Sequence, residues 1–411
     1  MFKKCLLFVL IVSVVTGMSF AVTTVNFMNF SSAGDNTQYL EEMKNVFEEQ
    51  NPDIKIKIET VGFGDYFTKL MTLIAGNNPP DAFELNYENF YTYAKKGVLL
   101  DLAQPMEKVG FDESNINEMA LKAFQADGKQ YGLPFSFSNV ILIYNKDLFD
   151  QAGAQYPTLD WTWQDELEAA KKIRELDPMT FGIYQPIQFW EFYKTVRQNG
   201  GSLLNDDKTE FTLNRKENIE TLQFMVDRVQ KYNVMPNDAQ LAGMGDWDLF
   251  ISGRLGMVVT GIWALPTFIK DCDFNWDIQV EPGNIAKSTH FFSNGVVISK
   301  DAKNKEEAFK WINFLSSSRE VAKIRIDAGW ELPAVTYQDI LDDYISQTPP
   351  ENREAVFESL NYLVTPPVIE NIGEMTDIIN RYLEEARYGE KTPEEALDAA
   401  QKELEEKIDL K

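Results

Sequence analysis

Histidine and cysteine are nearly absent from this chain of 411 residues, which has one His and two Cys. A zinc site with several His ligands is therefore excluded, and a Ser-His-Asp triad would have to use His290. The phosphate-binding motifs GxxxxGK(S/T) and GxGxxG, the nucleophile motif GxSxG and the zinc motif HExxH are also missing. Asp271, Asp273 and Asp277 lack the glycine that a calcium-binding loop needs for its turn. We therefore expect no metal and no cofactor, and a structural or surface role for His290.

No apolar run in the sequence is long enough to span a membrane, which takes about 18–20 residues. At the N-terminus, two lysines precede an apolar run at 5–15, and the small-x-small sequence Ser-Phe-Ala follows at 19–21. This arrangement is typical of a secretory signal peptide, residues 1–21. Cys5 lies inside the apolar run, so we expect no lipid anchor, and Cys272 is then left without a disulfide partner. The pattern predicts a soluble protein exported to the periplasm.

Basic residues are scarce, since 39 Lys and Arg stand against 64 Asp and Glu and give a net charge of −25. A surface of this sign repels phosphate groups, so we exclude nucleic acid and anionic membranes as partners. Apolar residues make up 44% of the chain, which is enough for two domains and excludes a disordered chain. Aromatic residues reach 13%, with 8 Trp and 16 Tyr, and so many amphipathic rings favour a surface that uses them for binding.

Strand and helix patterns alternate along the chain. The first part predicts strands and helices in the order β-α-β-α-β, at 23–30, 37–50, 54–61, 67–75 and 82–85. This order predicts a parallel sheet with right-handed crossovers. Later segments repeat the scheme, with strands at 140–145, 180–184, 255–260 and 295–299 and helices at 163–176, 216–232 and 305–315. From residue 376 the chain is nearly all helical in pattern, so the fold class is α/β with two lobes.

Six motifs follow one another along the chain and are informative as a set. They are GNNPPD at 76–81, YNKDLF with AG at 144–153, WQDEL with AAKK at 163–172, FxxGxxGM with GxW at 250–263, AxxWxxFL at 308–315 and GWxxP at 329–333. Together they resemble the extracellular solute-binding proteins of ABC transporters, family 1, a sugar-binding group similar to maltose-binding protein. The match begins at the N-terminal signal, ends in the C-terminal helices and therefore covers essentially the whole chain.

The resemblance implies a fold of two doubly wound α/β lobes joined by a hinge of crossing strands, as in type II periplasmic binding proteins. In this fold the lobes close on the ligand. We expect the crossings at 133–139, 293–296 and 329–335. The N-terminal lobe would then comprise 22–135 plus 296–332, and the C-terminal lobe 136–295 plus 333–411.

The resemblance also implies a function. The chain would be a monomeric periplasmic receptor, not an enzyme, that captures a neutral sugar or oligosaccharide and delivers it to the membrane permease subunits of an ABC importer. A receptor for a polyol, a sugar acid or a glycerol phosphate stays open, and an anionic ligand would call for Arg197, Arg254 or Arg325 in the cleft. A secreted glycosidase also stays open, because it needs only two carboxylates.

Polar candidates for ligand binding lie near predicted strand ends and crossings, because ligands of open α/β sheets bind beyond the carboxyl ends of strands. They are Asp35, Asn36, Tyr66, Asn86, Ser138, Asn139, Gln185, Asn294 and Glu331. Asp35 or Asn36 could equally cap the first helix, and Ser138 and Asn139 could equally make local turn bonds. Glu370 and Glu374 precede the last helices, where the family often adds a contact, and the choice between them stays open.

Tryptophans supply the other candidates, because an indole offers a flat partner for the apolar face of a pyranose and one N–H donor. Trp263 matches an aromatic residue of the family that follows the glycine at 261, so we expect it to stack on the sugar. Trp190, Trp247 and Trp330 lie in predicted loops or at segment ends and are the further candidates. Trp163 and Trp311 lie at helical spacing beside aliphatic residues, so we expect them in the core.

Overall fold

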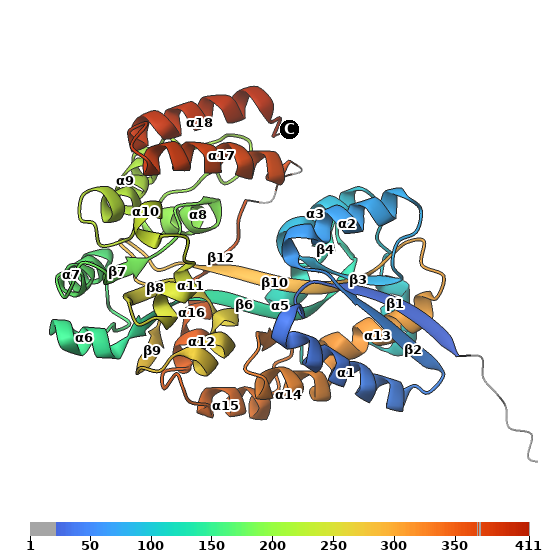
Figure 1. Ribbon diagram of the computed structural model, residues 1–411. Helices are drawn as coiled ribbons and strands as arrows, with labels where there is room; N and C mark the ends of the chain where they lie inside the picture. Colours follow the sequence, from blue (N-terminus) through green and yellow to red (C-terminus); the bar gives the residue numbers. More distant parts are fainter. Residues whose placement is uncertain (1–21, 368, 370, 411) are drawn as a thin grey trace, which may run out of the picture.

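The computed structural model describes residues 22–367, 369 and 371–410. The predicted signal peptide and Glu370 lie outside the described residues. Within the described part, no helix is long and apolar enough to cross a membrane. Two lobes stand next to each other and are joined by long strands (Figure 1).

The N-terminal lobe begins with the predicted parallel β-α-β-α-β unit. Its elements are β1 (Thr23–Asn29), α1 (Thr37–Gln50), β2 (Ile54–Thr60), α2 (Phe63–Ala75) and β3 (Ala82–Asn86). β1 pairs in parallel with β2 on one side and with β3 on the other, which confirms the predicted sheet. α1 buries Leu40, Met43 and Phe47, whose helical spacing places them on one face. α2 begins four residues before the predicted start, so Phe63 belongs to its first turn.

Further helices and one hairpin complete this lobe. The remaining elements are η1 (Gly34–Asn36), α3 (Tyr87–Lys95), α4 (Ala103–Val109), α5 (Glu118–Lys122), β4 (Gln125–Ala126), β5 (Lys129–Gln130), α13 (Lys305–Ser317) and α14 (Arg319–Asp327). Trp311 on α13 is fully buried, as predicted, and its ring meets those of Phe27 and Phe47 edge-on at 5.7 and 5.1 Å. Apolar faces from both parts of the chain therefore share one core.

Two long strands, β6 (Gly132–Asn145) and β10 (Thr289–Ile298), run through both lobes (Figure 1). They pair antiparallel with each other, and β10 also pairs with β3 through 294–298. A third segment crosses at β11 (Leu332–Pro333), which pairs with β6. The sequence predicted strands only at 140–145 and 295–299. Both strands are longer than predicted. The sequence pattern missed the first part of β6 because every residue of this strand is buried, so the alternation that marks a strand in a sequence is absent.

The C-terminal lobe continues the sheet in the order β6-β8-β7, with β9 also paired to β6. Its strands are β7 (Phe181–Tyr184), β8 (Leu255–Gly261), β9 (Trp276–Gln279) and β12 (Leu363–Val364). Its helices are α6 (Lys146–Ala152), α7 (Trp163–Arg174), α8 (Phe189–Gln198), α9 (Lys216–Gln230), α10 (Asp238–Leu241), α11 (Asp246–Ile251), η2 (Ile262–Ala264), α12 (Leu265–Asp271), α16 (Glu354–Ser359), η3 (Leu360–Tyr362), α17 (Ile372–Arg387) and α18 (Pro393–Lys407). The remaining helix, α15 (Gln338–Ser346), packs on α14 of the N-terminal lobe. α17 and α18 pack together at the edge of this lobe (Figure 1). Trp163 is buried, as predicted.

Candidate functional site

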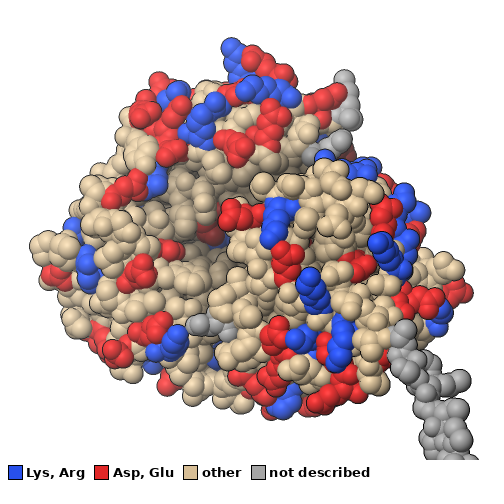
Figure 2. Space-filling model, turned by 45° about the vertical axis from the view of Figure 1, so that its right-hand side comes forward, with Lys and Arg blue, Asp and Glu red and all other residues tan. Residues whose placement is uncertain are grey.

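A cleft of about 1550 Å³ opens between the two lobes. Its walls come from the segments that follow β1, β3, β7 and β8, and its floor comes from β6, β10 and the third crossing. Figure 2 shows the surface hollowed between the lobes. The cleft thus lies at the carboxyl ends of the strands, where open α/β sheets bind their ligands.

The structure brings most of the predicted ligand residues together on this cleft. Those that line it are Asn36, Asn86, Ser138, Trp190, Trp247, Trp263, Asn294, Trp330 and Glu331. Asp35 lies in η1 beside them, and its side chain is outside the described part of the structure. Asn36 precedes α1, but its side chain makes no capping hydrogen bond there.

Tyr66, Asn139 and Gln185 do not line the cleft, so their selection as ligand residues is corrected. The hydroxyl of Tyr66 is buried and lies 2.8 Å from the carbonyl oxygen of Glu84. Asn139 Nδ2 donates to the carbonyl oxygen of Val356 at 2.8 Å. Gln185 is buried inside the C-terminal lobe. Tyr66 lies within α2, Asn139 lies within β6 and Gln185 follows β7, and all three side chains are buried.

Strand geometry explains why the side chains of Ser138 and Asn139 point in opposite directions. Both lie within β6 and pair with β10, so the predicted alternative of turn bonds is wrong for them. Successive side chains of a strand point to opposite faces of the sheet. Ser138 therefore reaches the cleft while Asn139 turns toward α16.

Three phenylalanines of the N-terminal lobe line the cleft and were missed by the sequence patterns. Phe30 and Phe63 meet edge-on at 5.3 Å between ring centroids, and Phe63 and Phe67 meet at 5.6 Å. The side chain of Phe63 is 58% exposed, which is unusual for a ring of this size. Two phenylalanines four residues apart directly after a strand could have indicated this aromatic wall, because both lie in the first turns of α2.

The opposite wall carries the tryptophans. Trp190, Trp247 and Trp263 line it together with Phe292, whose ring meets that of Trp263 edge-on at 5.1 Å. The Nε1 of Trp247 donates to Thr260 Oγ1 at 3.2 Å, which fixes the plane of its indole. Aromatic rings therefore face the cleft from both lobes.

The indole of Trp263 lies directly against Gly261. A Cβ atom on Gly261 would come within 2.0–2.2 Å of three carbon atoms of that indole. We therefore expect Gly261→Ala to displace the ring and to weaken ligand binding about tenfold, or ~1.4 kcal/mol. Gly373→Ala is the matched control, because the space around Gly373 in α17 is open. Titration calorimetry of both variants checks this, and equal affinity of the two would contradict the packing argument.

Glu331 lies where the three crossing segments meet. Its Oε2 accepts a hydrogen bond from Ser136 Oγ on β6 at 2.6 Å and from Arg325 Nη2 at 3.0 Å, with Asn294 Nδ2 of β10 at 3.5 Å. The guanidinium of Arg325 is fully buried, 4.1 Å from the ring centroid of Trp330. Burial lowers the pKa of Arg325 to about 10, against the attraction of Glu331, so the side chain stays charged at neutral pH. The pair holds a carboxylate and an indole in place on the cleft floor.

Carboxylates outnumber cations on the cleft. The lining includes Glu88, Glu191, Asp246, Asp271, Asp327 and Glu331, against Lys270 and Arg353. Arg197 and Arg254 bond backbone carbonyls elsewhere, at 3.2 Å each, and Arg325 is engaged by Glu331. The arginines expected for an anionic ligand are therefore not placed to bind one. Among the described residues, no group of three or more His, Cys, Asp or Glu side chains is arranged to hold a metal.

His290 is fully buried between the lobes. Its Nε2 lies 3.3 Å from Glu88 Oε1 on α3, and its Nδ1 contacts the hydroxyl of Tyr193 on α8. The single histidine thus connects one lobe with the other through β10.

The pH dependence of stability follows from buried groups. Burial raises the pKa of Glu84 and Glu88 from 4.5 to about 7. Between these values the folded protein binds more protons than the unfolded chain, so the free energy of unfolding falls as the pH rises through that range. Burial also lowers the pKa of His290 well below 6.5, which makes the folded state less stable as the pH falls below 6.5.

We therefore expect the melting temperature to be highest near pH 5 and to fall as the pH rises toward 8. Scanning calorimetry across this range checks it. Glu84→Gln should flatten the fall between pH 6 and 8, because it removes one of the buried titrating groups. A melting temperature that rises from pH 6 to 8 would show that these carboxyls are not buried in solution.

Two α/β lobes, crossing strands and a cleft at the hinge define a two-lobed solute-binding receptor. The chain belongs to the bacterial extracellular solute-binding protein family, whose model matches residues 33–322. This confirms the resemblance and the fold predicted from the motifs. Members of the family are substrate-binding receptors of ABC transporters rather than enzymes.

Several characterised proteins are similar to this chain. An ABC substrate-binding protein from Listeria monocytogenes, solved in complex with cycloalternan, is 50% identical, with a TM-score of 0.90 over 94% of this chain and 98% of that one. The arabinooligosaccharide-binding protein of Bacillus subtilis is 25% identical in an alignment of 413 positions. This alignment covers 94% of this chain and 92% of the relative. The GacH receptor of Streptomyces glaucescens is 20% identical, with a TM-score of 0.81 over 93% and 97% of the two chains, and supports the fold alone.

Proposed function

We propose that this protein is the receptor of an ABC importer for a neutral oligosaccharide, with cycloalternan as the first candidate ligand. The observation that carries the proposal is a cleft with aromatic rings on both walls and carboxylate and carboxamide groups between them. A pyranose has an apolar face that stacks on rings and a rim of hydroxyl groups that bond to polar side chains. The similarity of this chain to the cycloalternan-bound protein of Listeria monocytogenes supports the choice of ligand.

The size of the cleft favours more than one sugar unit. Its volume of about 1550 Å³ exceeds the roughly 300–1000 Å³ of an ordinary small-molecule site. Trp190, Trp247 and Trp263 would stack on the sugar rings. Asn36, Asn86, Ser138, Asn294 and Glu331 would bind hydroxyl groups, with Trp330 closing the floor. A hydroxyl partner left unpaired in a closed site costs about 1–3 kcal/mol, which is how such a site selects its ligand.

Transport would follow from closure of the lobes. The proposed lobes are 22–135 plus 296–332 and 136–295 plus 333–411, which turn about β6, β10 and the third crossing. The closed receptor would present both lobes to the membrane permease subunits. We also propose that the chain acts as a monomer, exported by residues 1–21 to the periplasm without a lipid anchor.

Thermal unfolding with a panel of ligands tests the proposal. The panel contains cycloalternan, linear neutral oligosaccharides, polyols, sugar acids and glycerol phosphate. A ligand at 100 times its Kd should add about 2.7 kcal/mol to the free energy of unfolding. We expect stabilisation by neutral oligosaccharides, and recovery of the bound sugar intact. Stabilisation by anions alone would overturn the proposed ligand class, and recovery of a cleaved sugar would establish a glycosidase.

A further inference from the structure

Glu191 is a carboxylate on the cleft that the sequence patterns did not single out. It lies in the first turn of α8, lines the wall of the C-terminal lobe and is 7% exposed. Its Oε2 accepts hydrogen bonds from Lys194 Nζ at 2.7 Å and from Gln185 Nε2 at 2.8 Å. Its Oε1 has no hydrogen-bond partner within the described parts of the chain. One oxygen is therefore held from behind, while the other is available on the side of the cleft.

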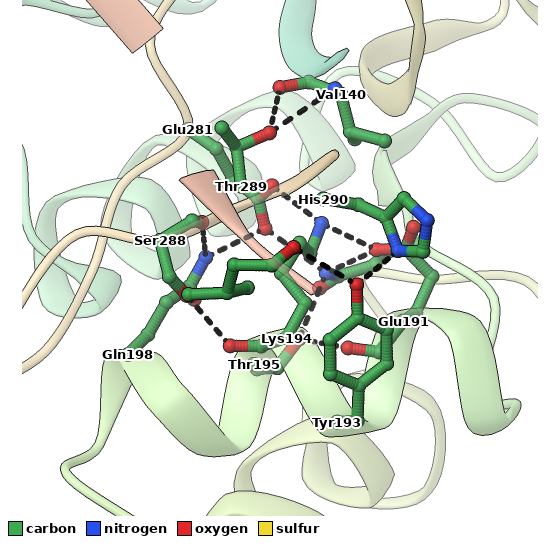
Figure 3. A network of polar contacts seen from close by, with 12 residues as sticks. Val140, Glu191, Tyr193, Lys194, Thr195, Gln198, Glu281, Ser288, Thr289 and His290 are labelled. Atoms are coloured by element: carbon green, nitrogen blue, oxygen red, sulfur yellow. Dashed lines mark hydrogen bonds and ion pairs between the residues drawn. The ribbon is translucent and has the colours of Figure 1, made fainter. Parts of the chain in front are cut away.

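Lys194 is the cation that holds this carboxylate. Its side chain is fully buried, and its Nζ contacts both Glu191 and Glu281 (Figure 3). Burial alone would lower the pKa of Lys194, but the carboxylates of Glu191 and Glu281 together raise it. The ammonium group therefore stays charged, although it is fully buried.

The rest of the network supports Lys194 and Glu191 from inside the lobe. Gln185 Nε2 also lies 3.2 Å from Glu281 Oε1, and its Oε1 accepts from Arg228 Nη1 at 2.6 Å. Gln198 Nε2 donates to Glu281 Oε1 at 2.9 Å (Figure 3). Of the residues in this network, Glu191 alone lines the cleft.

A purely structural network would not need a charged end at the cleft. Burying ions is costly, and apolar residues of similar volume often make a core at least as stable. What the buried lysine supplies is an ion pair that holds the Glu191 side chain in one orientation. A carboxylate has only acceptor atoms, so a group fixed in this way selects ligands that present hydroxyl donors. Trp190, the preceding residue, lines the same wall and would hold a sugar ring beside it.

We propose that Glu191 binds hydroxyl groups of the ligand through Oε1 and that Lys194 is its positioning residue, an inference that rests on the proposed oligosaccharide receptor. The class of ligand that this geometry favours is a neutral sugar with hydroxyl groups free at this position. An anionic sugar would be repelled by the Glu191 carboxylate. Lys194 offsets this repulsion only in part, because it also pairs with Glu281.

Titration calorimetry with cycloalternan, and with the best neutral oligosaccharide of the panel, tests the inference. Glu191→Gln keeps the shape of the side chain and should weaken binding about 10- to 100-fold, the effect expected for hydrogen bonds to a charged group. Lys194→Met should weaken it to a similar degree. The double variant should bind no more weakly than the weaker single variant, because both changes remove one interaction.

Other outcomes have equally definite meanings. If Glu191→Gln binds as tightly as the wild type, the inference is overturned while the receptor function stands. Additive losses in the double variant would overturn the positioning role of Lys194. If Lys194→Met does not fold, Lys194→Gln replaces it, because the amide also removes the charge and should weaken binding to a similar degree. A wild-type protein that binds none of the neutral sugars would overturn the inference and the proposed function together.

Discussion

Trp263→Ala is expected to weaken oligosaccharide binding about 100-fold, or ~2.7 kcal/mol, the loss typical of a tryptophan at the centre of a binding surface. The indole lies against Gly261 and meets Phe292 edge-on at 5.1 Å, so its position is fixed before a ligand arrives. Removing it takes away the flat surface on which the sugar ring would stack. The ring would then no longer be oriented toward the polar groups around it. Isothermal titration of the variant measures the loss.

Two further variants separate stacking from general damage. Trp263→Phe keeps a smaller ring and should recover part of the affinity. Trp311→Phe removes part of a fully buried indole in the N-terminal lobe, far from the cleft lining. It should lower the melting temperature and leave the Kd unchanged. Affinity within about threefold of wild type for Trp263→Ala, or ~0.6 kcal/mol, would show that the sugar does not stack there.

Arg325→Met is expected to lower the free energy of unfolding by about 3–5 kcal/mol, the usual cost of removing one partner of a buried ion pair. Arg325 is fully buried, and Glu331, its partner at 3.0 Å, is 8% exposed. Without the guanidinium, this carboxylate stays in the cleft floor with only Ser136 and Asn294 as donors. The contact to the Trp330 ring is lost as well, so we also expect weaker ligand binding. Urea unfolding at pH 7 and a ligand titration measure the two effects.

A double variant provides the control. Arg325→Met with Glu331→Gln removes both charges, so it should recover part of the stability that Arg325→Met loses, but not the affinity. A loss below about 1 kcal/mol for Arg325→Met would mean that water reaches the pair, as it does in surface ion pairs.

Much of the fold follows from local patterns. The apolar spacing of α1 gave its bounds, and the β-α-β-α-β order gave the parallel pairing of β1 with β2 and β3. These elements have one buried and one exposed face, so their periods can be seen in the sequence. The 132–139 part of β6 has no such alternation, because the crossing strands are covered on both sides. For this part the family resemblance predicted a crossing, but no strand pattern could be seen.

Some residues of the candidate site could also be predicted from the sequence, and others could not. Trp263 and Glu331 could be chosen from the sequence, because motifs and strand ends indicated their positions. Glu191 could not, since a carboxylate in the first turn of a helix usually faces solvent or favours the helix dipole. Phe63 was missed because the predicted helix began only at residue 67, whereas α2 begins at Phe63.

The sequence alone was sufficient for the class of this protein. Its composition excluded several chemistries, and its motifs, in their order, indicated a two-lobed receptor. Only the tertiary structure decided which side chains meet in the cleft. Ser138 reaches it while Asn139, the next residue, does not, and Gln185 turns to a buried cation while Glu191 turns outward. The reason is physical: patterns of burial are local and repeat along the chain, whereas a binding site joins side chains from distant segments whose orientation depends on how the lobes pack.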